Sequence, residues 1–298
     1  NGEKINIIDT KKDNNLIVHY AKKLPSDIYA TFKAVVNREE RTKTANNHTA
    51  THLLHHALRK ILGQHVEQKG SLVHPDYLRF DFSHFQKLSK EEINKIEQTV
   101  NHYIRENIQL EEKREVPMEE AKEKGATGLF GEKYGDVVRI IQFGDSIELC
   151  GGTHVEATGQ IGFFKITSEA AISAGIRRIE AITADKAEEY IYKKLDNLEE
   201  VSELLNNPKN VPKSVEKLVQ ENANLNKQVE ELLQDKVKNI KQDLINKKEN
   251  IYGINFIADI VDIQSSGAMK DMAFQLKKEV DNLVLFMGSN INGKEKRA

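Results

Sequence analysis

Two imidazoles lie four residues apart in the stretch His48-Thr49-Ala50-Thr51-His52. In a helix, residues i and i+4 lie on the same face, so both rings would point to one side. A thiol and an imidazole have the same spacing in the stretch Cys150-Gly151-Gly152-Thr153-His154, whose glycine pair permits a tight turn. Three imidazoles and one thiolate are an ordinary ligand set for tetrahedral Zn²⁺. The predicted ligands are therefore His48, His52, Cys150 and His154.

Two further histidines, His55 and His56, follow on the same predicted helix. At about 100° per residue, His55 lies on one narrow stripe with His48 and His52, largely opposite the leucines of the helix. The imidazoles of this stripe therefore do not occupy the middle of an apolar face, as packed core residues would. Because a single histidine is usually structural, we expect structural roles for His55 and His56.

Length and composition limit the classes of protein to consider. The chain has 298 residues, of which 30% are charged and 39% hydrophobic, and this suggests about two domains and a helical linker. It contains no run of about 18 apolar residues, so we expect no membrane span. The single cysteine excludes an internal disulfide and, with no visible signal peptide, fits a cytoplasmic protein. The net charge of −2 means that an RNA partner would need a local basic surface.

The first half of the chain alternates between strand and helix patterns. Residues 5–8 and 30–36 have strand patterns and suggest the remainder of a small β-domain. A helix is predicted from about 46 to 62, and Gly63 ends it as a C-cap. Alternation over residues 64–85 predicts strands, because side chains two residues apart share one face of a strand.

Turn and capping signals continue this pattern toward the second motif. Ser89 and Glu92 form a predicted capping box at the start of a helix. Pro117 suits the first turn of another short helix, which should end at Gly125. A hairpin is predicted around Gly144-Asp145, so that Cys150 lies at a strand end, and strands follow at about 161–167 and 176–183.

Glycines recur between residues 125 and 135. The run lacks the Lys-Ser/Thr ending of a phosphate-binding loop and does not fit the dinucleotide fingerprint. We therefore predict a surface loop here rather than a nucleotide site.

The second half becomes rich in Lys, Glu, Leu and Asn from residue 184 to about 250. Asn207-Pro208 and Val211-Pro212 divide this segment into two helices. A heptad seam in the second helix favours either a helical hairpin or a weak homodimer. Its leucines are Leu218, Leu225 and Leu232. Strand, helix and strand are then predicted at 254–263, 268–282 and 283–287, as the opening of a small α/β domain.

Six segments occur in an order that resembles the editing half of an alanyl-tRNA synthetase, with free-standing deacylases and the threonyl-tRNA synthetase editing domain as relatives. The resemblance is strong from about residue 41 to 190 and weakest over residues 1–40. The segments are 48–54, 68–73, 78–82, 129–136, 150–154 and 175–181.

This resemblance implies an α+β architecture, with an antiparallel sheet and helices in the editing domain. The implied parts are a partial β-barrel at 1–40, the editing domain at 41–190, a helical linker at 191–250 and a truncated α/β domain at 251–298. The absence of an initiator methionine and of an aminoacylation domain leads us to expect a fragment that cannot charge tRNA.

The implied reaction is hydrolysis of the ester that joins a wrong amino acid, Ser or Gly, to tRNA(Ala). Within the family motifs, Thr51 is the candidate for contacting a seryl hydroxyl, and Gln68 and Ser71 are candidates for lining the same pocket. The candidates for binding the acceptor end of the tRNA are Arg79, Arg177 and Arg178, of which strand alternation lets only one of the last two face the site.

Three questions stay open at the level of sequence. Four protein ligands would make a structural zinc site, whereas three would leave an open Lewis-acid position. Cys150 is also a candidate nucleophile, since a thiolate beside imidazoles is activated. The rival function from another class is a zinc-stabilised RNA-binding or dimerisation module without catalysis.

Overall fold

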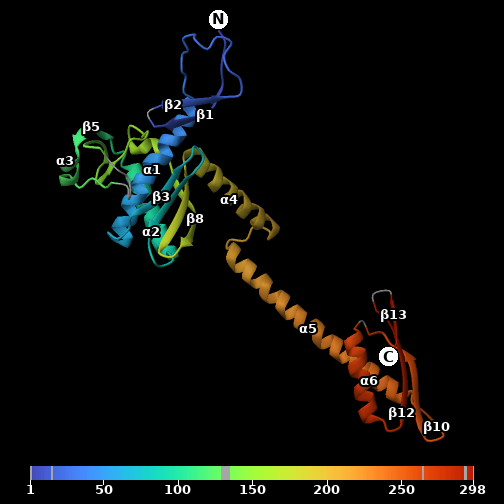
Figure 1. Cartoon of the computed structure of the whole chain (residues 1–298). Coiled ribbons are helices and arrows are strands. Elements are labelled where there is room, and N and C mark those ends of the chain that lie inside the picture. The colour runs from blue at the N-terminus through green and yellow to red at the C-terminus, as the bar shows by residue number, and fades with distance from the viewer. Residues whose placement is uncertain (1, 15, 129–134, 264, 292–293, 298) are drawn as a thin grey trace. The chain divides into compact units, whose positions relative to one another are not determined.

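The computed structural model describes residues 2–14, 16–128, 135–263, 265–291 and 294–297 (Figure 1). Residues 129–134 lie outside this set, and with them the middle of the glycine run and most of the 129–136 motif. The chain divides into two compact units, Asn1–Leu195 and Asp196–Ala298. Each unit is α+β, with mainly antiparallel sheets.

The N-terminal segment forms one hairpin, in which β1 (Ile7–Asp13) pairs antiparallel with β2 (Leu16–Ala21). The strand predicted over residues 30–36 is absent, and the prediction was wrong. The side chains of this stretch are exposed, and no described strand pairs with it, so its β-type residues have neither a ladder nor a core to join. That the hairpin belongs to a barrel stays a prediction.

The main sheet of the first unit has four antiparallel strands in the order β3-β4-β9-β8. Phe80 of the central strand β4 lies opposite Ile179 of β9, and both are fully buried. The alternation read from the sequence therefore defines the buried face of this sheet. The strands are β3 (Gln68–Val73), β4 (Leu78–Ser83), β8 (Phe164–Ser173) and β9 (Ile176–Thr183).

Two helices, α1 (Arg38–Leu62) and α2 (Lys90–Arg105), pack with this sheet around one core (Figure 1). Helix α1 begins eight residues earlier than the predicted start near 46, because the Asn37 side chain caps the backbone N–H groups of Glu39 and Glu40. Gly63 ends the helix, and the capping box at the start of α2 is present, as predicted.

A second sheet of three antiparallel strands carries the turn that begins at Cys150. Its strands are β5 (Glu111–Pro117), β6 (Val137–Phe143) and β7 (Ser146–Leu149), with α3 (Met118–Glu123) after β5 and the 3₁₀ turn η1 (Thr158–Ile161) after the site. The hairpin of β6 and β7 was predicted. Strand β5 was not, since within it only Val116 is buried, and the five residues before Val116 are charged and exposed.

The second unit, described by itself, contains the end of α4 (Ala184–Leu204) and α5 (Val211–Asn246), followed by a four-stranded sheet. In that sheet β11 and β12 are parallel and joined by α6, which confirms the predicted strand–helix–strand order. The remaining elements are β10 (Glu249–Ile251), β11 (Ile254–Ile260), α6 (Ser266–Glu279), β12 (Leu283–Ile291) and β13 (Lys294–Arg297).

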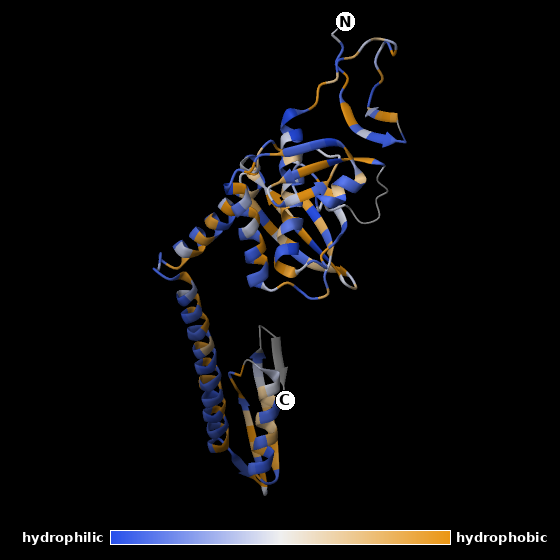
Figure 2. Cartoon of the chain, turned by 90° about the vertical axis from the view of Figure 1, so that its left-hand side faces the viewer, coloured by the Kyte–Doolittle hydropathy of each residue, from blue (hydrophilic) through white to orange (hydrophobic). Residues whose placement is uncertain are grey.

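Helix α5 is largely hydrophilic, with apolar residues interspersed along it (Figure 2). The seam leucines are exposed: 50% for Leu218, 59% for Leu225 and 68% for Leu232. A partner for the seam therefore stays a prediction. None of the helices in the described part of the chain combines the length and apolar character needed to cross a membrane.

Asn101 of α2 ties this helix to β8 through a buried amide. Its Nδ2 donates to the Phe164 carbonyl at 2.8 Å, and its Oδ1 accepts from the Phe164 N–H at 2.9 Å. Both backbone groups of Phe164 therefore depend on one side chain that is 6% exposed.

We expect Asn101→Ala to lower the free energy of unfolding of the first unit by about 2–4 kcal/mol, because each buried polar group left unpaired costs about 1–3 kcal/mol. Urea unfolding followed by tyrosine fluorescence measures this unit, since every tyrosine except Tyr252 precedes residue 196. The matched control is Asn94→Ala at an exposed position of the same helix, which should change stability by less than about 0.5 kcal/mol. Equal effects of the two substitutions would contradict the prediction.

Candidate metal centre

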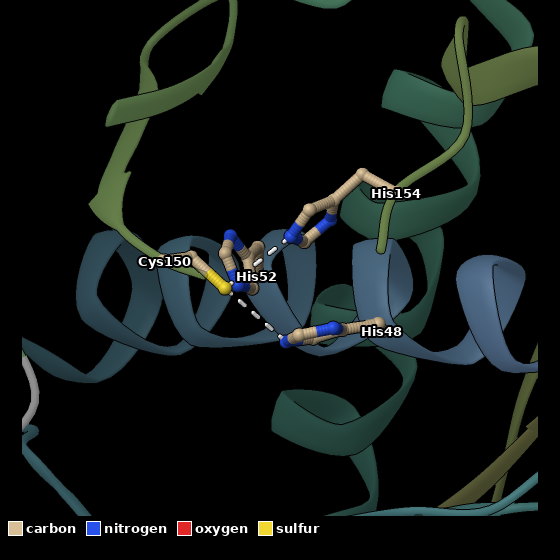
Figure 3. Close-up of side chains that lie close together, drawn as sticks. All are labelled: His48, His52, Cys150 and His154. Atoms are coloured by element: carbon tan, nitrogen blue, oxygen red, sulfur yellow. Dashed lines mark hydrogen bonds between the residues drawn. The ribbon is translucent and has the colours of Figure 1, made fainter. Parts of the chain in front are cut away.

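Four donor side chains from two distant parts of the chain meet at one point (Figure 3). Helix α1 supplies His48 and His52, and the turn after β7 supplies Cys150 and His154. One donor atom from each residue lies within 4.8 Å of all the others. The Cys150 Sγ is 3.5 Å from the His48 Nε2 and 3.3 Å from the His154 Nε2. With bonds of about 2.0–2.3 Å, a tetrahedral zinc site separates its ligand atoms by about 3.3–3.6 Å.

The far side of each imidazole in this group contacts another polar group. The Nδ1 of His154 lies 3.1 Å from the Thr49 hydroxyl, which also accepts a hydrogen bond from the Val155 N–H. His48 hydrogen-bonds the backbone of Thr153. Such contacts fix the orientation of a ring and leave its other nitrogen for a metal.

The turn that carries Cys150 and His154 is held in place by Arg139 of β6. Its guanidinium donates to the Cys150 carbonyl at 3.1 Å and to the Gly152 carbonyl at 2.6 Å, and its Nε donates to Glu112. Gly152 is required here by close approach, since a Cβ at this position would lie 2.0 Å from the His48 Cε1. The spacing in the second motif therefore reflects packing against the first.

Burial lowers the pKa of all three clustered imidazoles. The effect of burial is largest for each ring, and neighbouring imidazoles add to it for His52 and His154. The pKa of His154 falls to about 3, and that of His52 falls well below its usual range. The rings are therefore neutral near pH 7, which is the protonation state that a metal ligand needs. Three neutral imidazoles and a thiol fit Zn²⁺ in both donor type and spacing.

His55 and His56 lie outside this group. His56 is half-buried, with its ring 5.6 Å from that of Tyr103. His55 is 3% exposed, and its Nδ1 lies 2.8 Å from the Glu148 carboxylate. Sequence analysis missed Glu148, although its position two residues before Cys150 at a predicted strand end was a usable signal, since residues i and i+2 of a strand share a face.

The residues predicted to line a substrate pocket lie on α1 and β3. Thr51 is 3% exposed, and its hydroxyl donates to the Asn47 carbonyl at 2.8 Å. The Gln68 Nε2 donates to the Ser71 hydroxyl at 3.1 Å. These contacts define where the three side chains lie, and their role toward a substrate stays a prediction.

The three arginines predicted to bind tRNA are located on β4 and β9. Arg178 makes two hydrogen bonds of 2.7 Å to Asp81, and the Arg79 Nε lies 3.9 Å from the same carboxylate. Arg177, on the other face of β9, is buried and paired with Glu169. The partly exposed side chains are thus Arg79 and Arg178.

The comparisons with known proteins agree with this picture. Residues 138–180 match the family model described as the threonyl and alanyl tRNA synthetase second additional domain. This segment contains β7, β8 and most of β6 and β9, and with them Cys150 and His154 of the metal group.

Alanine–tRNA ligases are similar to almost the whole chain. The sequence is 52% identical to the Christiangramia forsetii enzyme and 51% identical to the Cytophaga hutchinsonii enzyme, over 98% of the chain and 34% of each enzyme. The Porphyromonas gingivalis enzyme is 47% identical over 100% of the chain and 34% of its own length. The chain therefore belongs to the alanine–tRNA ligases and spans about a third of their length, including the second additional domain.

Proposed function

We propose that residues 41–190 form a deacylase that hydrolyses the ester between tRNA(Ala) and a wrongly attached Ser or Gly. The observation that carries this proposal is the convergence of His48 and His52 with Cys150 and His154. The last two residues lie in the segment that matches the second additional domain. The family relationship supports a tRNA partner, and the donor set supports a metal-dependent site.

The metal that suits these residues best is Zn²⁺. When bound, it would act as a Lewis acid or as an anchor for the aminoacyl end of the substrate. The protein contributes the orientation: α1 fixes two rings, and the hydrogen bonds from Arg139 fix the turn. We favour a metal that orients the substrate, with the attacking water positioned by substrate hydroxyls and polar neighbours.

Thr51 is our candidate for selecting Ser over Ala. Its hydroxyl hydrogen is donated to the Asn47 carbonyl, so the oxygen retains lone pairs that can accept a bond from a seryl hydroxyl. An alanyl side chain cannot make that bond. A site built to bond a hydroxyl discriminates against the analogue that lacks it by up to about 10⁴–10⁵.

Arg79 and Arg178 are our candidates for contacting the phosphates of the acceptor end. Both have partly exposed side chains on neighbouring strands, near the Asp81 carboxylate, which hydrogen-bonds Arg178. Bidentate pairing of this kind holds an arginine in a defined direction and leaves further N–H donors for a phosphate.

A second candidate function is a zinc-stabilised module for dimerisation or RNA binding. The exposed seam on α5 favours it, since Leu218, Leu225 and Leu232 need a partner to be buried. Release of Ser from Ser-tRNA(Ala) distinguishes the two functions, because a binding module does not hydrolyse the ester.

We expect the purified chain to bind one Zn²⁺ and Cys150→Ala to weaken that binding by more than about 100-fold. Loss of a residue that only orients a ligand costs about 10–100-fold in affinity, so loss of the ligand itself should cost more. Competition with a chromogenic chelator measures the affinity. His56→Ala, on the same helix but outside the group, should bind as the parent does. Equal affinities in the Cys150 and His56 variants would refute the site.

The parent chain loaded with zinc should release Ser from Ser-tRNA(Ala) faster than it releases Ala from Ala-tRNA(Ala). Cys150→Ala should slow the first reaction by roughly 10²-fold, because a displacement of about 1 Å in a positioned site has that cost. Radiolabelled amino acid released with time is the readout. A loaded parent chain that hydrolyses neither ester would contradict the deacylase and favour the binding module.

Thr51→Val should lower the ratio of the hydrolysis rates of Ser-tRNA(Ala) and Ala-tRNA(Ala) by at least about tenfold. The reason is that it removes the hydroxyl that an alanyl side chain leaves without a hydrogen bond. The matched control is Thr42→Val, which removes a hydroxyl bonded in the same i−4 manner at an exposed position of α1. The control should keep the parental ratio. An unchanged ratio in the Thr51 variant would exclude it as the selecting group and leave the deacylase standing.

A further inference from the structure

Glu148 is a buried carboxylate that lies between two histidines of α1. It is 6% exposed and belongs to β7, two residues before Cys150. One carboxylate oxygen lies 2.8 Å from the His55 Nδ1, and the other lies 3.3 Å from the His52 Nδ1. Each oxygen of Glu148 thus faces a different imidazole.

These contacts determine where both rings carry their hydrogen. An ionised carboxylate only accepts hydrogen bonds, so each Nδ1 that faces Glu148 must be the N–H of its ring. The Nε2 of each neutral ring is then a bare lone pair. For His55 this assignment also avoids a buried N–H without an acceptor, because the His55 Nε2 has no hydrogen-bond partner among the described residues.

We propose that Glu148 is a positioning residue of the metal centre, which holds the His52 Nε2 lone pair toward His48, Cys150 and His154. His55 is the second support of the carboxylate and is not itself a ligand. The inference rests on the proposed zinc site and assigns that site an additional, non-ligating group.

The charges of the buried groups support this role. A bound Zn²⁺ with the Cys150 thiolate alone would leave one net positive charge in a buried site. The Glu148 carboxylate brings the sum to zero, while the nearby Arg139 is already paired with Glu112. Because Glu148 and Cys150 are two residues apart at the end of one strand, β7 delivers a ligand and the charge that balances it together.

The substitution Glu148→Gln tests this arrangement with little change in shape. A glutamine side chain has one accepting oxygen and one donating NH₂ group, so it can accept from only one of the two Nδ1 atoms. The other ring then faces a donor and loses its preferred tautomer. We expect zinc affinity to fall by about 10–100-fold, the usual cost of removing the carboxylate partner of a ligating histidine.

Chelator competition gives the zinc affinity, and the visible absorption of the Co²⁺-loaded chain gives the ligand geometry. Glu148→Gln should weaken zinc binding and alter the Co²⁺ spectrum. The matched control is Glu169→Gln, since Glu169 is also a buried, paired carboxylate of the same unit but contacts Arg177 instead of the metal group. Glu169→Gln should leave affinity and spectrum unchanged, whatever it does to stability.

The outcomes separate this inference from the proposed function. A parent chain that binds no zinc would overturn the metal centre itself. If the parent chain binds zinc and Glu148→Gln binds it equally tightly, with the same Co²⁺ spectrum, only the role of Glu148 would be overturned.

If Glu148→Gln does not fold, the parent chain alone still decides the question. Imidazole ¹⁵N–¹H NMR spectra of the zinc-loaded chain should show Nδ1–H tautomers for both His52 and His55. They should also show zinc bound through the His52 Nε2 and no metal on His55. A His52 ring that carries its proton on Nε2, or binds zinc through Nδ1, would exclude the proposed arrangement.

Discussion

The amide of Asn47 fixes the position of α1, and the geometry of the site depends on that position. Its Nδ2 donates to the carbonyls of His74 and Pro75 in the loop between β3 and β4, and its Oδ1 accepts from the hydroxyl of Thr183 at the end of β9. Three bonds to two different parts of the sheet leave the helix neither free to rotate nor free to slide. Since His48 is the next residue, the same bonds set the direction in which the histidine face of α1 points. The apolar face then packs in the core, and the polar face meets the turn after β7.

The local parts of this arrangement could be predicted because their signals are local. Spacing of four residues placed His48 and His52 on one helix face, and the Ser89 capping box and the Gly63 C-cap marked helix ends. The failures have a different origin. Residues 30–36 have strand propensity, but none of the strands that the structure describes pairs with them, whereas β5 has a neighbour but little propensity. Strand formation depends on the partner, which a single segment does not specify. Glu148 was missed for the same reason: its importance comes from His52 and His55, more than ninety residues away along the chain.

Helix α1 combines a structural and a chemical role at a thermodynamic cost. Six of its buried side chains are polar, and they fall within ten consecutive residues: Asn46, Asn47, Thr49, Thr51, His52 and His55. Burying such groups is unfavourable unless each is bonded, and imidazoles held close together without a metal gain little from one another. A ligand that binds only the folded state would offset this cost by mass action. The region with the most buried polar groups is therefore the region whose stability depends most on what it binds.

The missing side chain of Gly152 restricts how this site can change over evolutionary time. A methyl group there would overlap the ring of His48, and a smaller residue at 48 would remove a donor. A side chain at position 152 is therefore accommodated only together with a smaller residue at position 48, which couples two segments that are far apart in the sequence. In proteins that have lost this centre, we expect positions 48 and 152 to vary together. In proteins that have kept it, we expect His at 48 and Gly at 152.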